Sequence, residues 1–338
     1  MTRSTYVAMT MAGPGVAPAP VDRPMPEPAA GEAVVRVHAS SMNYHDLVNL
    51  LGLLEGPWPR VPMSDGAGEV VALGAGVDNV AVGDRVIGAF HPGWLDGPPM
   101  PGSKKPVPGD SCDGWLQQYQ TFPATALIRT PPHLTDVQAA TLPCAGTTAW
   151  SALEAGRVGP GDVVVTQGTG GVSLYGLQLA KARGATVILT SSSDAKLEFG
   201  RGLGADHGVN YATNPDWERQ VRALTDGRGA ELVLDIGGEQ TLAHSVRATR
   251  MGGTVAIIGV LSGFGAAEIP VSVAMMQNIH LVGITVGSVK AHSELCAAVA
   301  TAGIVPPVSH VLGWDQTGEA MRVMQANEHL GKIALEVP

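Results

Sequence analysis

The chain has 338 residues, which is long for one ordinary domain and comfortable for two. Hydrophobic residues make up 45% of it, so the composition excludes a chain that is disordered for lack of apolar surface. The 21 basic and 30 acidic residues give a net charge of −9 without any run of lysine or arginine, which argues against nucleic acid as a partner.

The sequence also lacks the signals of membrane insertion and secretion. No apolar run reaches the roughly 18 residues of a membrane span, and the segment 1–6 has no apolar core of a signal peptide. The three cysteines, Cys112, Cys144 and Cys296, are odd in number and far apart, which excludes a disulfide framework. We therefore expect a cytoplasmic protein with no membrane partner.

Residues 1 to about 125 predict short β-strands separated by turn residues. The segments 33–38, 66–72 and 84–87 are examples, each bounded by Gly, Pro or Asp. A loop rich in Pro and Gly follows from His91 to Asp113. The aromatic side chains at its two ends indicate that this loop packs over another part of the protein.

From about Ala139 the pattern alternates between strands and helices. Asn214 followed by Pro215 predicts the start of one of these helices. Six strands with helical crossovers are typical of a parallel, doubly wound sheet. The predicted strands are 163–167, 186–190, 209–211, 231–236, 254–258 and 279–286, with helices at 171–183 and 194–204; the tail adds strand 308–312, helix 316–326 and strand 332–337.

A glycine-rich turn, Gly168-Thr169-Gly170-Gly171-Val172-Ser173, lies between a predicted strand and a predicted helix. This is the context that a dinucleotide-binding turn requires. The first glycine permits the tight turn, the second allows backbone N–H groups to approach a pyrophosphate, and the helix N-terminus favours its negative charge. Ser173 replaces the third glycine of the fingerprint. The turn therefore predicts a bound nicotinamide dinucleotide.

The residues after the second strand of this sheet indicate which dinucleotide binds. NAD sites place an acidic residue about 20 positions after the turn, where it binds the ribose 2′-hydroxyl. Ser191 occupies that place here, and Ser192 and Lys196 follow it, so repulsion of a 2′-phosphate is absent and hydroxyl and ammonium groups could bind it. Asp194 is the alternative ribose acceptor. The sequence favours NADPH over NADH.

Four motifs together carry a resemblance to a known family. They are Asn43-Tyr44-His45-Asp46, Ser64-Asp65-Gly66-Ala67-Gly68, Pro143-Cys144-Ala145-Gly146 and the glycine turn. With them the chain resembles, over nearly its whole length, the medium-chain dehydrogenase/reductase superfamily, especially its zinc-independent, quinone-oxidoreductase-like or alcohol dehydrogenase-like branch. The resemblance implies an α/β protein in which a GroES-like β-barrel catalytic domain (1–125 and 303–338) accompanies a Rossmann doubly wound parallel-sheet domain (126–302). It also implies an active site in the cleft between them.

The resemblance further implies that no metal is bound. Zinc-dependent relatives hold their catalytic zinc with a cysteine, a histidine and a second cysteine, and these positions hold Asn43, Ser64 and Cys144 here. One thiolate cannot make a three-ligand site. The loop that would hold a structural zinc contains only Cys112. We therefore expect catalysis without zinc.

The candidate catalytic residues are Asn43, Tyr44 and His45, which could donate hydrogen bonds to the substrate oxygen. For Tyr44 and His45 the alternative roles are packing under the nicotinamide and holding a loop. Some enoyl-reducing relatives use a tyrosine directly after the glycine that follows this segment, but Leu53 follows Gly52 here. The expected cofactor site comprises Thr148, Gly168, Thr169, Gly170, Gly171, Val172, Ser191, Ser192, Lys196, Tyr211, Gly259 and Leu261. The candidate substrate pocket comprises Trp58, Phe90, Trp94, Cys144 and Phe264. For the four aromatic residues the alternative is packing in the core or in a lid, and for Cys144 it is buried packing beside the nicotinamide.

Three functions remain open at this point. The first is an NADPH-dependent, zinc-free oxidoreductase that transfers a hydride to the activated C=C bond or quinone ring of a small molecule. The second is a zinc-independent alcohol dehydrogenase or carbonyl reductase, and the third is a non-catalytic dinucleotide-binding protein. The family also implies a homodimer that associates through the last strand of the sheet, 279–286, whose edge would otherwise expose unpaired backbone groups.

Overall fold

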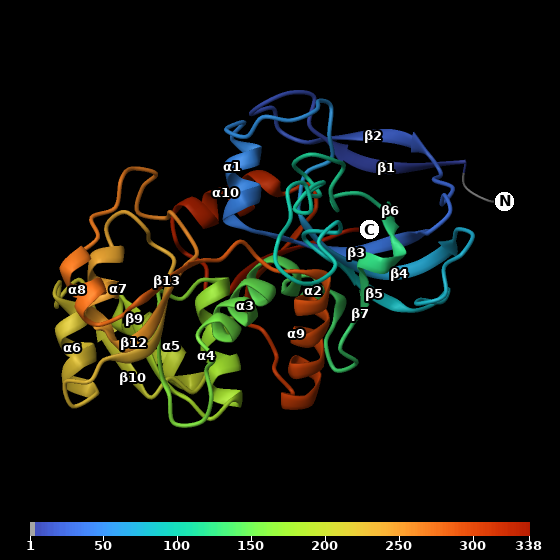
Figure 1. The fold of residues 1–338 in the computed structure, drawn as a ribbon. Helices are drawn as coiled ribbons and strands as arrows, with labels where there is room; N and C mark the ends of the chain where they lie inside the picture. Colours follow the sequence, from blue (N-terminus) through green and yellow to red (C-terminus); the bar gives the residue numbers. More distant parts are fainter. Residues whose placement is uncertain (1–3) are drawn as a thin grey trace. The chain divides into compact units, whose positions relative to one another are not determined.

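A computed structural model describes residues 4–338, which form two units (Figure 1). The terminal unit contains the described residues up to Thr147 together with Val286–Pro338, and the central unit is Thr148–Thr285. These boundaries differ from the expected ones at 126 and 302. Strand β7 (Leu127–Arg129) belongs to the terminal unit because it pairs with strand β5 (Arg85–Gly88). Helix α9 (Val289–Ala302) belongs to the same unit because it packs on β7.

The terminal unit is built around a mixed sheet with the order β14-β15-β3-β4-β5-β7, in which β6 also pairs with β3. The last strand of the chain, β15 (Lys332–Glu336), lies antiparallel to β3 (Glu32–Met42), so the two ends of the chain form one sheet. The other elements of this unit are β1 (Thr5–Thr10), β2 (Ala19–Pro24), α1 (Tyr44–Leu50), β4 (Asp65–Leu73), β6 (Tyr119–Pro123), η1 (Ala124–Ala126), α2 (Asp136–Ala139), the π-helical turn η2 (Leu142–Gly146), β14 (Val308–Gly313) and α10 (Thr317–Gln325).

A methionine-rich core holds the terminal unit together. Met9, Met11, Met42 and Met63 are buried in it beside leucines of α1. Residues of α10 and β15 join the same cluster. Because flexible methionine side chains fill irregular space, they suit a core formed by segments from both ends of the chain.

The central unit is a six-stranded parallel sheet with the order β10-β9-β8-β11-β12-β13. The predicted doubly wound sheet is confirmed. Every residue of β8 (Val163–Gln167) is buried, as expected for a parallel strand covered on both faces. The other elements are α3 (Thr147–Ala155), α4 (Gly171–Ala182), β9 (Thr186–Ser191), α5 (Asp194–Gly202), β10 (His207–Asn210), α6 (Trp217–Leu224), β11 (Ala230–Asp235), α7 (Leu242–Ala248), β12 (Thr249–Ile257), α8 (Val271–Met276) and β13 (His280–Gly283).

Two predicted boundaries in the central unit are wrong. The helix α6 has Asp216 as its N-cap, and the Asn214 side chain instead donates to the backbone oxygen of Asn210 within the preceding turn. Strand β13 is shorter than 279–286 and ends at Gly283.

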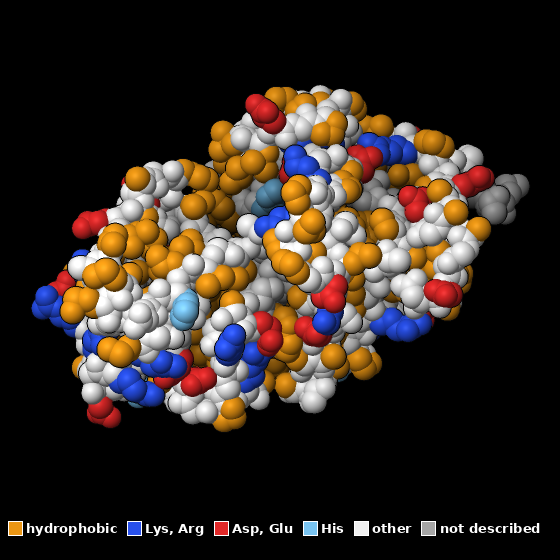
Figure 2. Space-filling view, in the orientation of Figure 1, with side chains coloured by type: hydrophobic (Ala, Val, Ile, Leu, Met, Phe, Trp, Pro, Cys, Tyr) orange, Lys and Arg blue, Asp and Glu red, His pale blue; other side chains and the backbone are white. Residues whose placement is uncertain are grey.

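Within residues 4–338, no helix combines the length and the apolar character that crossing a membrane requires. On the face in Figure 2, basic and acidic side chains are interspersed.

Candidate functional site

The glycine turn of the central unit has the backbone that a dinucleotide site needs. Gly168 has a φ of +72°, in the left-handed region that favours glycine, and Gly170 is the N-cap of α4. A Cβ placed on Gly170 would find no atom within 4 Å, so this side of the turn is open to a ligand. Ser173 is buried and its hydroxyl donates to the backbone oxygen of Gln167, which closes the junction between β8 and α4. The predicted strand-turn-helix context is confirmed, and the residues fit a pyrophosphate.

A buried carboxylate lies at the carboxyl end of the neighbouring strand β11. Asp235 is buried completely and accepts hydrogen bonds from the hydroxyls of Ser245 (2.5 Å) and Thr241 (2.7 Å). The Gln167 amide donates to the same Ser245 hydroxyl at 2.8 Å. This network ties the ends of β8 and β11 together beside the glycine turn. The sequence analysis missed it, although an acidic residue directly after an apolar strand was a visible signal.

The residues predicted to bind the 2′-phosphate meet at the ends of β9 and β10. Ser191 pairs with Asn210 across these strands, and the Tyr211 N–H donates to the Ser191 oxygen at 3.0 Å. Ser192 is exposed, and Lys196 lies in the first turn of α5.

Asp194, the alternative ribose acceptor, lies at the same place and is exposed. Its carboxylate accepts from the Asn210 amide at 2.7 Å.

The other predicted cofactor residues lie at the same end of the sheet or at the start of the unit. Gly259 and Leu261 follow β12, where the Leu261 N–H donates to the oxygen of Ile236. A Cβ on Gly259 would lie 2.4 Å from that oxygen, so only glycine fits this approach. Thr148 is buried near the start of α3.

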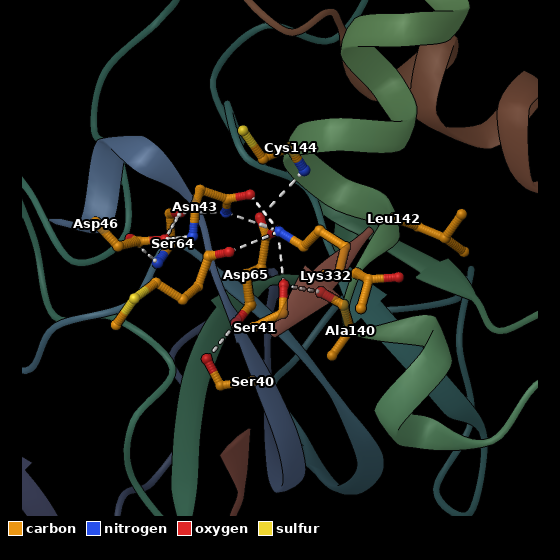
Figure 3. Close-up of polar contacts among 12 residues, drawn as sticks. Ser40, Ser41, Asn43, Asp46, Ser64, Asp65, Ala140, Leu142, Cys144 and Lys332 are labelled. Atoms are coloured by element: carbon orange, nitrogen blue, oxygen red, sulfur yellow. Dashed lines mark hydrogen bonds and ion pairs between the residues drawn. The ribbon is translucent and has the colours of Figure 1, made fainter. Parts of the chain in front are cut away.

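A buried polar cluster fills the positions of the terminal unit that resemble zinc-ligand positions (Figure 3). Asp46 in α1 accepts from the backbone N–H of Asn43 and of Ser64, both at 2.8 Å, and from the Ser64 hydroxyl at 3.1 Å. Its carboxylate thus joins the end of β3, the start of α1 and the segment before β4.

Both polar ends of the Asn43 side chain are satisfied inside this cluster. Its amide nitrogen donates to Asp65 at 2.8 Å and to Ser64 at 3.2 Å, and its amide oxygen accepts from the Lys332 ammonium. The same ammonium donates to the oxygen of Met42 at 2.9 Å and lies 3.8 Å from the Asp65 carboxylate. Asn43 therefore has no polar atom left to offer a substrate.

Burial sets the electrostatics of this cluster. It raises the pKa of the Asp65 carboxyl to about 7, against the opposing effect of the Lys332 charge. Burial also raises the pKa of the Cys144 thiol well above its usual range, and the nearby Asp65 charge adds to this. The backbone N–H of Cys144 donates to Asp65 at 3.1 Å, which fixes η2 to the start of β4.

The donor set does not fit a catalytic zinc. The amide and the hydroxyl at the first two ligand positions, Asn43 and Ser64, are neutral groups bonded to neighbouring residues, so Cys144 is the single usual zinc ligand among the three positions. Among residues 4–338, no group of three or more His, Cys, Asp or Glu side chains is placed to hold a metal ion.

His45 and three of the predicted pocket residues come together around Phe90. The ring centroids of His45 and Phe90 are 5.4 Å apart, edge to face, and the His45 Nε2 atom is buried without a partner. Phe90 packs with Cys144, Val107 and Val286.

The loop after β5 continues this cluster. The ring of His91, the next residue, lies 4.8 Å from Phe90 and 6.2 Å from Trp94. His91 was missed by the sequence analysis; its position directly after a predicted pocket residue was the available signal.

The remaining predicted residues lie apart from this group. Tyr44 begins α1 and is exposed. Trp58 packs on the methionine-rich core, with the Arg60 guanidinium 3.9 Å from its ring centre, and is not part of the Phe90 cluster. Phe264 belongs to the central unit and is 72% exposed.

Comparisons with known proteins match both units. The alcohol dehydrogenase GroES-like domain matches residues 29–132, and the zinc-binding dehydrogenase domain matches residues 171–301. A zinc-type alcohol dehydrogenase-like protein of Schizosaccharomyces pombe is 38% identical over 315 residues, which cover 91% of each chain. The chain belongs to the medium-chain dehydrogenase/reductase superfamily.

Solved structures agree with this assignment. A Sinorhizobium meliloti protein provisionally described as an alcohol dehydrogenase is 39% identical with a TM-score of 0.93 and covers 100% of both chains. An NAD-dependent alcohol dehydrogenase is 32% identical with a TM-score of 0.88, covering 99% of this chain and 100% of its own. The 2-octenoyl-CoA carboxylase reductase CinF, solved with NADP and 2-octenoyl-CoA, is 26% identical with a TM-score of 0.86, covering 99% and 88%. The protein is an NAD(P)H-dependent oxidoreductase.

Proposed function

We propose that this protein is an NADPH-dependent, zinc-free reductase that transfers a hydride to the activated C=C bond or quinone ring of a small molecule. One observation carries the proposal: His45 holds a buried, unpartnered ring nitrogen beside Phe90, while the would-be zinc ligands are bonded to one another. The bound nicotinamide cofactor supplies the hydride, and the residues of this chain orient the substrate and stabilise the charge that develops on its oxygen.

The preference for NADPH rests on the end of β9. Ser191 and Ser192 add no negative charge there, and Lys196 supplies an ammonium group. Asp194, the alternative ribose acceptor, already accepts a hydrogen bond from the Asn210 amide through Oδ1 at 2.7 Å. Related structures are described with either cofactor, so the local chemistry decides the preference. A 2′-phosphate would gain charge-assisted hydrogen bonds at this place.

Without zinc, hydrogen-bond donors must polarise the substrate oxygen. His45 is the first candidate, because its Nε2 is buried beside Phe90 without a partner and can donate or accept according to the tautomer. Tyr44 is the second, from the exposed start of α1. Asn43 is not a candidate donor, because its amide hydrogens are donated to Ser64 and Asp65. Its role is instead to position the start of α1.

A second candidate function is the reduction of a carbonyl group without zinc. Leu53 follows Gly52, where some enoyl-reducing relatives have a tyrosine, and the similar Schizosaccharomyces pombe protein is named for alcohol dehydrogenases. In this reaction His45 would donate a proton to the developing alkoxide, whereas in C=C reduction it would donate a hydrogen bond to an enolate oxygen.

The rate of NADPH oxidation, measured side by side with a quinone, an enone, an enoyl thioester and an aldehyde, distinguishes the two reactions. We expect the enone or the quinone to be reduced fastest; an aldehyde preference would select the second function, and no oxidation with any of them would reject both.

His45→Ala should lower the rate about 10²–10³-fold, as losing one such donor typically does. His45→Gln, whose amide can still donate near the Nε2 position, should retain part of the rate.

We also propose a homodimer formed at the outer edge of the central sheet. Strand β13 is an edge strand, and its backbone groups can pair with a second copy. Helix α8, directly before it, buries none of its residues and exposes Val271 (69%), Met275 (69%) and Met276 (72%). Hydrophobic side chains gather over α8 in Figure 2, as expected for a surface that another chain covers.

A further inference from the structure

Two histidines flank Phe90 in the terminal unit, and each has a buried ring nitrogen without a partner. The Nε2 atoms of His45 and His91 are both inaccessible to solvent and accept or donate no hydrogen bond within the described chain. Both imidazole rings pack edge to face against the Phe90 ring, with centroid distances of 5.4 Å for His45 and 4.8 Å for His91. Buried polar groups in native proteins are almost always paired, so these two unpaired nitrogen atoms point to a hydrogen-bond partner that is not part of the chain.

The tautomer of His91 is fixed by its other nitrogen. The Nδ1 atom lies 2.9 Å from the backbone oxygen of Lys104, and because a carbonyl oxygen can only accept, Nδ1 must carry the hydrogen. Burial lowers the pKa of His91 to about 4, with the Lys104 charge adding to the effect, so the ring is neutral at neutral pH. Nε2 therefore presents a bare lone pair and is an acceptor only.

Among the described residues, no side chain donates a hydrogen bond to that lone pair. Phe90, next to His91, packs in an apolar cluster with Val107, Val286 and Cys144, and the Trp94 indole donates to the oxygen of Gly97. The donor must therefore come from outside the chain, from an ordered water or from a bound molecule.

We propose that His91 Nε2 accepts a hydrogen bond from a hydroxyl group of the substrate, so that the preferred substrates are hydroxylated quinones or hydroxylated α,β-unsaturated carbonyl compounds. This inference rests on the proposed function, in which His45 binds the reacting oxygen. His91 then selects among reducible molecules by a second polar group, because a site built around an acceptor disfavours a ligand that lacks the donor.

The competing role for His91 is structural: its Nδ1–H anchors the loop that contains Lys104. Two substitutions separate the roles because each keeps one nitrogen position. The amide of His91→Asn can still donate near the Nδ1 position but has nothing at Nε2. The longer amide of His91→Gln can present an oxygen near Nε2 but loses the anchor. Both keep a polar side chain of moderate size.

The probes are 2-butanone, 1-hydroxy-2-butanone and 4-hydroxy-2-butanone, which share one carbon skeleton. Their dissociation constants are measured by calorimetry with the full-length protein saturated with NADP⁺, so that binding is read without turnover. We expect at least one hydroxyketone to bind the wild type about three- to tenfold more tightly than 2-butanone, the gain of one ordinary hydrogen bond. His91→Asn should abolish this preference, and His91→Gln should keep part of it.

A second measurement does not depend on the variants. In ¹⁵N-labelled protein, the His91 ring should show a protonated Nδ1 and a bare Nε2 throughout pH 6–8, and the Nε2 resonance should move when the preferred hydroxyketone is added. Equal affinity of the wild type for all three ketones, a preference that survives in His91→Asn, or a protonated Nε2 would each overturn the proposal. Failure of the proposed function would look different, since none of the quinone, enone, enoyl thioester and aldehyde substrates would then cause NADPH to be oxidised, while the hydroxyketone preference remained.

Discussion

The ammonium of Lys332 donates a hydrogen bond to the amide oxygen of Asn43, and both side chains are buried in the terminal unit (Figure 3). Lys332 begins the last strand of the chain and Asn43, directly after β3, is the N-cap of α1, so the contact joins segments from opposite ends of the sequence. The Asp65 carboxylate lies 3.8 Å from the same ammonium. This buried charge arrangement organises the segments that carry Tyr44, His45 and Cys144.

Replacing Lys332 by methionine should destabilise the protein strongly. The substitution leaves Asp65 buried without its cationic neighbour, and removing one partner of a buried pair typically costs about 3–5 kcal/mol. The free energy of unfolding in urea measures this. Lys332→Arg, which keeps the charge, should be less affected.

A matched control is Lys181→Met, which removes an ion pair with Asp206 on the surface of the central unit. Surface pairs are worth roughly 0–1 kcal/mol, so the control should change stability little. Equal effects of the substitutions at Lys332 and Lys181 would contradict the role assigned to Lys332.

His292 should make the protein less stable in mild acid. This residue of α9 is buried without a partner for either ring nitrogen, and burial lowers its pKa from 6.5 to about 3. Between these values the unfolded chain binds a proton that the folded chain does not, so stability falls as the pH drops below 6.5.

The test compares the wild type with His292→Phe at pH 7 and pH 5. Since one pKa unit corresponds to about 1.4 kcal/mol, the free energy of unfolding of the wild type should fall by about 2 kcal/mol more than that of the variant over this interval. A difference between the two proteins that is the same at both pH values would show that His292 titrates normally in the folded state.

Ser191→Asp should reverse the cofactor preference. A carboxylate at the end of β9 repels a 2′-phosphate and offers an acceptor to a ribose 2′-hydroxyl. We expect NADPH to bind about 10–100-fold more weakly while NADH binds no worse, as measured by titrating cofactor fluorescence. A parallel loss for both cofactors would indicate a damaged fold, and tighter binding of NADH by the wild type would contradict the assignment of NADPH.

Met276→Asp should dissociate the proposed homodimer, because a charge on the exposed face of α8 would be buried at the interface. Sedimentation velocity over a range of concentrations measures this. Val82→Asp, on an exposed residue of the terminal unit, serves as the control and should leave the dimer intact. A wild type that stays monomeric at every concentration would reject the dimer.

The sequence predicts the sheet of the central unit because its signals are local. Each strand is a short apolar run, and the turn at Gly168 stands between a strand and a helix. The predicted strand 279–286 extends too far, because apolar residues beyond Gly283 look the same in sequence whether or not a strand continues.

The candidate site is predicted less well, because its contacts join distant segments. Asn43 looks like a substrate donor in the sequence, yet Lys332 and Asp65 satisfy its amide. Nothing in the residues near Lys332 indicates that its ammonium lies buried against the end of β3. The unpartnered Nε2 of His91 likewise follows from packing around Phe90, which no local pattern encodes.

The central claim, that this oxidoreductase works with NADPH and without zinc, is tested most directly by one measurement. The rate of NADPH oxidation with an enone is compared before and after dialysis of the purified protein against 1,10-phenanthroline, with zinc content determined on the same samples. The account predicts no stoichiometric zinc and an unchanged rate. Stoichiometric zinc that the chelator removes together with turnover would contradict it, and would mean that Cys144 binds metal with partners other than Asn43 and Ser64.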